Sequence, residues 1–462
     1  MILNQNSIIH RSIYPFSAVI HNLDTTEIND DHLYESDENY LLRAIDYFNE
    51  NNFFKFSRKL FSITRKKLIE AEKILLNEEI VCAIKSVLVN SRETANSQTV
   101  LILLMATISN LWHNKSLLNK NIYRNDIFDL IIVFLEKDNF DGEIYREALH
   151  CICYFIQSEE NAMFLIEHGT INSLNNFIQK SNILDSSLLS YFFKILSRLY
   201  KYLSPRNYNM IYDFTFSFIA MVLDDFYIYI EDKRLLKVAS YIVRDKQGYS
   251  LLKSSQFFQY FFSISDIFYC NIVKFSSIIL NKIVKYDEWK VLKFEELYKS
   301  CVDIIYNELH FLHWLKNWPY LCKFLRNSLL YQSKAFYDAG LVDLMKQIFC
   351  GDHNSILKIN SLSCYCAYLI YSTNDDFVEE IAKINIDILL NFLEDDPQNR
   401  SSKWIFQVFL RMIDFGKIDN NHIDSINQLV LEITNPFLPD QRLIEMIHFL
   451  QSKLEIISKY QA

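Results

Sequence analysis

A short pattern built around a glycine recurs in two distant parts of the chain. Gly169 stands two residues before an apolar anchor at Ile171, and Gly340 stands two residues before an anchor at Val342. In both copies a short helical segment precedes the glycine and an amphipathic segment follows it. Glycine is the residue that most readily adopts the left-handed backbone of a sharp corner between two helices. The pattern therefore predicts helices joined by tight corners.

The anchor position recurs along most of the chain at intervals of 40 to 46 residues. An internal period of this length is typical of helical repeat proteins. Before Ile127 the glycine is replaced by Asn125, and asparagine also tolerates the left-handed conformation. The nine anchors are Val81, Ile127, Ile171, Phe216, Phe258, Tyr298, Val342, Ile386 and Ile426.

Composition supports a helical array. Half of the 462 residues are apolar, yet the chain has only six glycines and six prolines. Folds rich in strands need many tight turns, and glycine and proline supply them. A long apolar segment follows each anchor helix, as in residues 147–156 and 360–370. Such segments are expected to form helices that are buried between neighbours on several sides.

The segments 164–171 and 336–342 closely resemble the junction between the first and second helices of armadillo repeats. The resemblance implies an all-α fold, a right-handed α-solenoid of about nine armadillo- or HEAT-like repeats with helical caps. The expected organisation is a flexible acidic N-terminal arm at residues 1–38, an N-terminal helical cap at 39–77, the repeat solenoid at 78–445, and a C-terminal closing helix and tail at 446–462.

Cysteine usage and charge limit the class of protein. The nine cysteines follow no regular spacing and lie in apolar stretches, which predicts reduced core thiols in the cytoplasm or the nucleus. The N-terminus lacks the features of a signal peptide, and no apolar stretch reaches the roughly twenty residues that span a membrane. A net charge of −9 argues against a general nucleic-acid binder. We expect a monomer with a protein or peptide partner, without membrane association.

The sequence lacks recognisable catalytic and phosphate-binding motifs. It contains no Gly-rich phosphate loop, no nucleophile elbow and no His-Glu-x-x-His motif. His310 and His313 have a spacing that can chelate a metal, but no third ligand is evident nearby. We therefore expect no catalytic residues, no cofactor and no metal site.

The armadillo resemblance also suggests where a partner binds. In this family the third helices line a concave groove, and importin-alpha-like adaptors carry there a Trp and, four residues later, an Asn in each repeat. The corresponding positions here keep the asparagine only at Asn110 and Asn327 and keep no tryptophan, which disfavours a basic cargo peptide. By the same alignment, the groove residues are Asn110, His150, Tyr154, Lys194, Arg198, Lys237, Tyr241, Lys282, Lys323 and Asn327.

Five of these positions are cationic and fall in four consecutive repeats of an acidic protein. A row of cations favours an acidic or phosphorylated segment as ligand, although the same residues could be ordinary solvated positions. We expect a non-catalytic protein–protein interaction scaffold or adaptor. Two alternatives within the family are a divergent importin-alpha-like nuclear transport receptor and an armadillo-type Hsp70 co-chaperone. The cationic positions are Lys194, Arg198, Lys237, Lys282 and Lys323.

Overall fold

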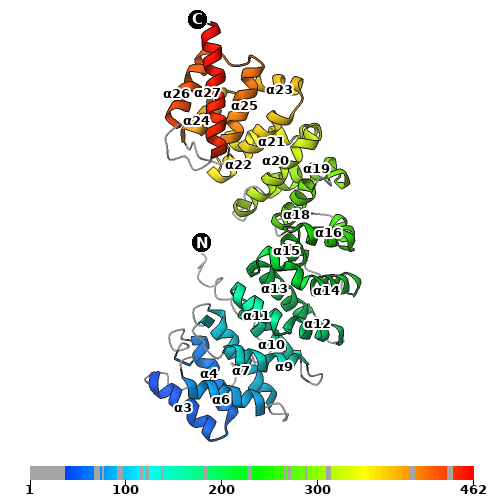
Figure 1. Ribbon diagram of the computed structural model, residues 1–462, viewed down its shortest axis with the longest axis vertical. Coiled ribbons are helices and arrows are strands. Elements are labelled where there is room, and N and C mark those ends of the chain that lie inside the picture. Colours follow the sequence, from blue (N-terminus) through cyan, green and yellow to red (C-terminus); the bar gives the residue numbers. More distant parts are fainter. Residues whose placement is uncertain are drawn as a thin grey trace. The chain divides into compact units, whose positions relative to one another are not determined.

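All regular elements in the described part of the chain are helices, which confirms the predicted all-α class (Figure 1). The chain forms two compact units, residues 1–257 (unit 1) and 258–462 (unit 2). The computed structural model describes residues 37–66, 73–74, 77–90, 97–114, 118–119, 124–136, 140, 142–180, 186–225, 232–264, 267–268, 272–286, 289–308, 314–395, 401–433 and 441–461.

Unit 1 is built from consecutive short helices that each pack on their neighbours. Its elements are α3 (Asp37–Asn49), α4 (Phe53–Lys66), α6 (Glu78–Asn90), α7 (Ser97–His113), α9 (Arg124–Glu136), α10 (Gly142–Phe155), α11 (Glu159–Glu167), α12 (Thr170–Lys180), α13 (Ser186–Tyr202), the 3-10 helix η1 (Pro205–Ile211), α14 (Tyr212–Asp225), α15 (Asp232–Ile242) and α16 (Lys246–Ser254). Helix α17 (Phe257–Ser263) begins at the boundary between the units.

Unit 2 continues the same alternation of helices. Its elements are α18 (Val273–Lys285), the 3-10 helix η3 (Trp289–Val291), α19 (Phe294–Glu308), α20 (Trp314–Asp338), α21 (Leu341–Cys350), α22 (Ser355–Tyr371), α23 (Asn374–Ile381), α24 (Ile386–Asp395), α25 (Ser402–Asp414), α26 (Asn420–Ile433) and α27 (Gln441–Gln461).

The nine predicted anchors lie in nine different helices, and each of these helices is followed by a partner helix. We call the partner the third helix of its repeat, because a short first helix (α11, α16 or α23) precedes the pair in several repeats. The third helices pack on one another within each unit, as α7, α10, α13 and α15 do in unit 1 (Figure 1). The pairs are α6/α7, α9/α10, α12/α13, α14/α15, α17/α18, α19/α20, α21/α22, α24/α25 and α26/α27.

Hydrogen bonds from a third helix, or from the turn that follows it, to the preceding third helix or cap helix recur at nearly the predicted period. In each bond a side chain reaches back to the preceding helix, so the repeat is visible in the polar contacts as well as in the core. The donor, acceptor and separation are Asn110 to Thr64 with 46 residues, Gln157 to Trp112 with 45, Arg198 to Cys153 with 45, Asn327 to Asn281 with 46, and Arg411 to Leu369 with 42.

Third helices are buried nearly all round, as their apolar sequences predict. In α22 the run from Asn360 to Leu369 is buried without interruption. Its polar members bond to carbonyls one turn earlier: Ser361 donates to Leu357 O at 2.8 Å and Ser363 to Asn360 O at 2.8 Å. Because these hydroxyl groups are satisfied within their own helix, they can be buried at little cost in free energy.

The predicted glycine corners are confirmed, and one predicted corner is wrong. Gly169 and Gly340 adopt left-handed backbone angles, with φ of 72° and 80°. Asn125 does not form such a corner, because it lies inside α9, which begins one residue before it. Among the described residues other than glycine, the left-handed asparagine is instead Asn51, with φ of 57°, between α3 and α4.

Substituting Gly340 with alanine should lower the free energy of unfolding by about 1 kcal/mol, because a Cβ atom is disfavoured at a positive φ. An added Cβ would meet no atom within 4 Å, so the loss is conformational only. The matched control is Gly142→Ala, at the start of α10, where the surroundings are equally open and no positive φ is recorded. Urea denaturation followed by circular dichroism measures both. Equal midpoints for the two variants would contradict the prediction.

Helices at both ends of the chain cover the repeats. In the region predicted as the N-terminal cap, α3 and α4 pack on each other and α4 packs on α7. At the other end, α27 packs on α25 and α26. Residues 1–36 of the predicted acidic arm lie outside the described residues.

Candidate functional site

Predicted groove residues of three consecutive repeats come together in unit 1. They lie on α10, α13 and α15, which pack in that order (Figure 1). The structure adds three residues from the same helices and from α7. We call this set the unit 1 binding surface: His113, His150, Tyr154, Tyr191, Lys194, Arg198, Lys201, Lys237 and Tyr241.

Aromatic rings form a connected row from α7 to α13. The ring centroids of His113 and Tyr154 are 4.7 Å apart in an edge-to-face arrangement. Tyr154 is also 4.7 Å from His150, which in turn is 5.3 Å from Tyr191. Contacts at these distances stabilise each ring beyond the burial of its surface. The row therefore orders aromatic side chains across three repeats, with Tyr191 buried and His113 exposed at the surface.

Cations of α13 lie over this row. Lys194 Nζ is 4.3 Å from the centroid of the Tyr191 ring, and the Arg198 guanidinium is 4.8 Å from that of Tyr154. Arg198 Nη1 also donates a hydrogen bond of 2.7 Å to the carbonyl of Cys153 in the last turn of α10. Stacking and the hydrogen bond together restrict the guanidinium to one orientation. Arg198 thus connects two repeats and displays a fixed positive charge.

Electrostatics confirm that the charged groups of this surface lie close together. The pKa of Lys237 is lowered, first by burial and then by the positive charges of Lys201 and Arg198. The pKa of His113 is lowered by burial, by Arg198 and by His150. The neighbouring positive charges disfavour the charged forms of Lys237 and His113, and an added anion would favour them.

A buried carboxylate lies beneath the α10 side of the surface. Glu147 is 3% exposed, and its Oε2 lies 3.5 Å from His150 Nδ1. The geometry does not make a hydrogen bond, because His150 Nδ1 has no such partner among the described groups. This acid places a negative charge beside His150, on the α10 side of the surface.

The remaining predicted groove residues have other surroundings. Asn110 donates a hydrogen bond of 3.4 Å to Thr64 of the cap helix α4. Asn327 donates one of 2.5 Å to Asn281 and so connects two successive repeats. Lys282 lies 5.6 Å from the Tyr286 ring, and Lys323 is exposed. Lys282, Lys323 and Asn327 belong to unit 2, and the clustering described here concerns unit 1 alone.

Sequence reasoning missed His113, Tyr191 and Lys201. The alignment considered two positions per helix, and each of these residues lies one turn before or after them. Lys201 had a signal that could have found it, since Lys194, Arg198 and Lys201 stand at i, i+4 and i+7 and so share one helix face. His113 and Tyr191 become recognisable only from ring contacts between helices.

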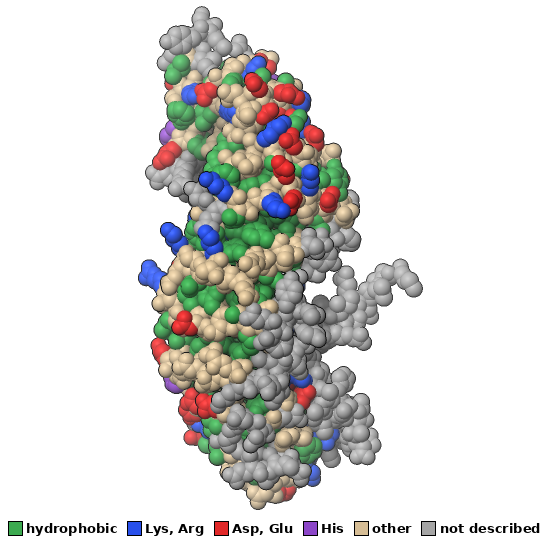
Figure 2. Space-filling model, turned by 90° about the vertical axis from the view of Figure 1, so that its right-hand side faces the viewer, with side chains coloured by type: hydrophobic (Ala, Val, Ile, Leu, Met, Phe, Trp, Pro, Cys, Tyr) green, Lys and Arg blue, Asp and Glu red, His purple; other side chains and the backbone are tan. Residues whose placement is uncertain are grey.

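Charges elsewhere are more evenly mixed. In unit 2, the face drawn in the upper part of Figure 2 has acidic and basic side chains interspersed. Several lysines of unit 2 have carboxylate partners, as in Lys334–Asp338 at 3.1 Å and Lys383–Glu379 at 2.7 Å. By contrast, the described residues place no carboxylate within ion-pair distance of Arg198, Lys201 or Lys237 in unit 1. Within the described part of the chain, the positive charges of these three residues are therefore not neutralised by a salt bridge.

Cysteines follow the predicted pattern with two exceptions. The eight described cysteines are free thiols, and six of them are buried, as predicted for core residues. Cys82 and Cys350 are exposed, so their assignment to the core was wrong. Each lies on the outward side of an amphipathic helix, where an apolar stretch alone does not reveal burial.

The structure also bears on metals and membranes. Within the described ranges, no three His, Cys, Asp or Glu side chains gather closely enough to hold a metal ion. His310 and His313 lie outside those ranges. Of the helices described, none combines the length and the apolar character needed to cross a membrane.

Comparison with known proteins supports the fold class. No family model and no curated protein matches the chain. A crystal structure of an engineered protein is similar, with a TM-score of 0.66 and 10% identity over 90% of this chain and 99% of that chain. Two further engineered proteins, 12% and 11% identical, give TM-scores of 0.39 and 0.42 over 50% and 53% of this chain and 90% and 96% of their own. The first likeness shows the fold alone, and together with the helix order it defines an all-α helical repeat protein.

Proposed function

We propose that this chain is a non-catalytic, armadillo-type scaffold that binds an acidic or phosphorylated segment of a partner protein on the unit 1 binding surface. The observation that carries the proposal is the group formed by Arg198 and Lys201 on α13 and Lys237 on α15, for which the described residues provide no carboxylate within ion-pair distance. Charge complementarity to such a surface attracts an anionic chain and orients it.

The construction of the surface supports binding. Its side chains stand on packed helices, and Arg198 is oriented by Tyr154 and by the Cys153 carbonyl. A surface that is already ordered loses little conformational entropy when a ligand arrives. Aromatic and arginine side chains are also the residues that most often dominate binding energy at interfaces. Rings and cations of this kind hold a ligand, and no bond-breaking step is needed to explain them.

The armadillo assignment rests on the repeats that have three helices. In the series α11, α12 and α13, a short first helix ends in a left-handed glycine before the second helix begins. Helix α23 stands before α24 and α25 in the same way, although no left-handed glycine joins it to α24. The free thiols are in keeping with a reducing compartment, and we propose the cytoplasm or the nucleus.

Reversing the charge of two lysines tests the proposed partner binding by the scaffold. In the Lys194→Glu/Lys237→Glu variant, recovery of partners should fall by roughly tenfold or more, because repulsion replaces attraction at the centre of the surface. The measurement is quantitative affinity purification with mass spectrometry, using the full chain as bait. Circular dichroism checks that helix content is retained.

The matched control is Lys290→Glu/Lys403→Glu, two exposed lysines of unit 2 whose reversal changes the net charge equally. Partners that depend on the surface should be lost from the first variant and kept by the second. Identical recovery with both variants would place partner binding elsewhere on the chain.

A further inference from the structure

We propose that Arg198, Lys201 and Lys237 form a subsite for a single phosphate group on a phosphorylated peptide. This inference rests on the proposed scaffold function and specifies the chemistry of its ligand. The three residues come from two neighbouring third helices, α13 and α15.

Helix geometry brings the three cations to one place. Arg198 and Lys201 are separated by three residues on α13, so their side chains share a face. Lys237 comes from α15, which packs directly on α13, and its pKa is lowered by burial and then by the positive charges of Lys201 and Arg198. Lys237 is half-buried, whereas Lys201 is exposed. The group is therefore partly shielded from water at Lys237 and open to solvent at Lys201.

Arg198 is already oriented for a ligand. Its Nη1 donates a hydrogen bond of 2.7 Å to the Cys153 carbonyl oxygen. The guanidinium carbon lies 4.8 Å from the centroid of the Tyr154 ring. A guanidinium has five N–H donors in a fixed fork. Within the described part of the chain, the Cys153 carbonyl is the acceptor recorded for them, so donors are left over for an oxyanion.

Acidic neighbours are already occupied by other groups. Glu159 accepts hydrogen bonds from the backbone N–H of Ser204 at 3.0 Å and from Asn207 at 3.3 Å. Asp245 accepts from Tyr212 Oη at 2.8 Å and from the Gly248 N–H at 3.0 Å. Neither carboxylate lies within ion-pair distance of Arg198, Lys201 or Lys237, so neither forms a salt bridge with the subsite in the described part of the chain.

The number and arrangement of the cations favour a phosphate monoester over a carboxylate. A phosphate monoester has a charge of about −1.5 to −2 at neutral pH and three acceptor oxygens. Three cations from two packed helices offer one donor for each phosphate oxygen, whereas a carboxylate has only two oxygens. The dianion also relieves more of the repulsion among the cations than a monoanion does.

The same arrangement favours a peptide over a nucleic acid. Nucleic-acid binders neutralise several phosphates in succession, and the affinity depends on that number. Here the cations are concentrated on two helices, and the adjoining part of the surface presents His113 and Tyr154. The chain as a whole has a net charge of −9. One phosphate beside apolar or aromatic peptide residues fits this pattern.

The test uses the full chain and three degenerate peptide pools that are identical except for a central phosphoserine, serine or aspartate. A single-stranded RNA oligonucleotide is the fourth probe. Retention of the chain on each immobilised probe is measured for the wild type and for Lys201→Gln, Lys237→Gln and Lys290→Gln. The last variant is a matched control, because Lys290 is an exposed lysine of unit 2.

We expect the phosphoserine pool to retain roughly tenfold more wild-type chain than the serine or aspartate pools, and either Lys201→Gln or Lys237→Gln to remove most of that advantage. Lys290→Gln should behave as the wild type. Lys201 is exposed, so its substitution leaves the fold intact even if Lys237→Gln disturbs packing.

Three results would overturn the inference in different ways. Equal retention on all three peptide pools, still weakened by Lys237→Gln, removes the phosphate subsite and leaves the scaffold function standing. RNA retention that equals the phosphoserine pool and shows the same sensitivity assigns the subsite to nucleic acid. Retention that no substitution changes, or no retention on any probe, contradicts both the subsite and the proposed scaffold surface.

Discussion

Replacing Arg411 with alanine should lower the free energy of unfolding of unit 2 by about 3–5 kcal/mol. Arg411 lies on α25 and donates to the carbonyls that end α22: to Leu369 O, to Ile370 O at 2.9 Å and to Ser372 O at 2.9 Å. The last carbonyls of a helix have no partner within it, and charged hydrogen bonds are worth about 1.5–3 kcal/mol each. Alanine would leave these carbonyls without their donor.

The surroundings of Arg411 make the loss larger than that of an ordinary arginine. Its guanidinium is 4.3 Å from the Phe377 ring and 5.7 Å from that of Phe415, so it also fills the space between two repeats. A positive charge at the C-terminus of α22 further favours the helix dipole. Arg411→Lys should recover only part of the stability, because an ammonium group cannot reproduce the planar fork.

Urea denaturation and hydrogen exchange measure this prediction. In repeat proteins neighbouring units can unfold separately, so amide exchange at α22 and α23 reports the local effect directly. The control is Arg206→Ala, which removes an exposed arginine and should change stability by no more than about 0.5 kcal/mol. If Arg411→Ala and Arg206→Ala shift the midpoint equally, the carbonyl-capping role of Arg411 is wrong.

The repeat architecture could be predicted from local chain chemistry. Gly169 and Gly340 predicted two helix–helix corners, because few residues other than glycine adopt a left-handed turn. The structure shows a positive φ at both glycines. Asparagine is a weaker signal, because it is also compatible with a helix. That ambiguity explains why Asn125 is helical while Asn51 takes the left-handed turn.

The candidate site could be predicted only in part. Lys194, Arg198 and Lys237 were found because helix periodicity and the repeat length place them on corresponding faces. His113 and Tyr191 were missed because their contacts join residues of different repeats, and such pairings depend on how two helices pack. The same limit applies to Arg411, whose acceptors stand about 40 residues earlier in the chain.

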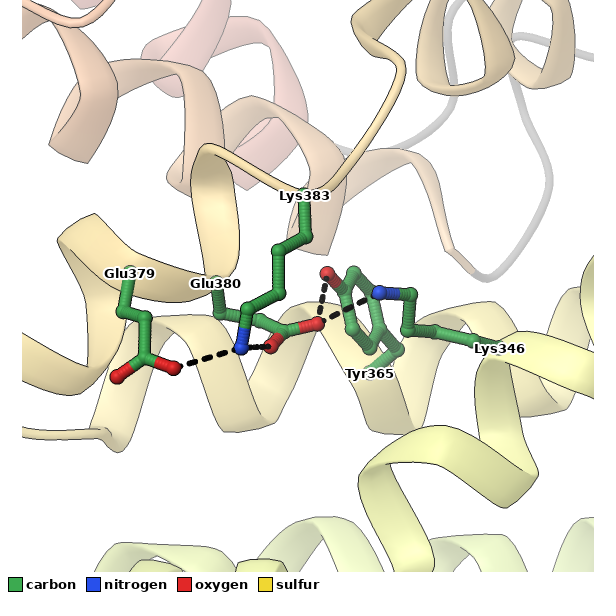
Figure 3. A network of polar contacts seen from close by, with 5 residues as sticks. All are labelled: Lys346, Tyr365, Glu379, Glu380 and Lys383. Atoms are coloured by element: carbon green, nitrogen blue, oxygen red, sulfur yellow. Dashed lines mark hydrogen bonds and ion pairs between the residues drawn. The ribbon is translucent and has the colours of Figure 1, made fainter.

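Polar networks that hold three helices together are another feature that a repeat pattern does not reveal. Glu380 on α23 is 2% exposed, although glutamate is seldom buried. Figure 3 shows its carboxylate between side chains of α21 and α22. Oε1 accepts from Lys346 Nζ at 2.8 Å and from Tyr365 Oη at 3.1 Å, and Lys383 Nζ lies 3.6 Å from Oε2. The buried carboxylate thus joins the α21/α22 pair to α23, the first helix of the next repeat.

Replacing Glu380 with alanine should therefore lower the free energy of unfolding by about 3 kcal/mol or more. Breaking a buried ion pair from one side typically costs about 3–5 kcal/mol, since the remaining charge loses its partner. The Lys346 side chain is 24% exposed and can partly regain water, which places the expected value near the lower end. The Tyr365 hydroxyl lies on a residue with no exposed surface and would be left unsatisfied.

Glu379→Ala is the matched control, because Glu379 precedes Glu380 on the same helix and also contacts Lys383, at 2.7 Å, but is 66% exposed. Exposed pairs contribute about 0.2–1 kcal/mol, so this variant should remain close to the wild type in urea denaturation. The double variant Lys346→Met/Glu380→Leu should recover much of the lost stability, because apolar residues of similar volume can replace a buried pair. A double variant as unstable as Glu380→Ala would mean that packing around Glu380, and not its charge, holds α23 against α21 and α22.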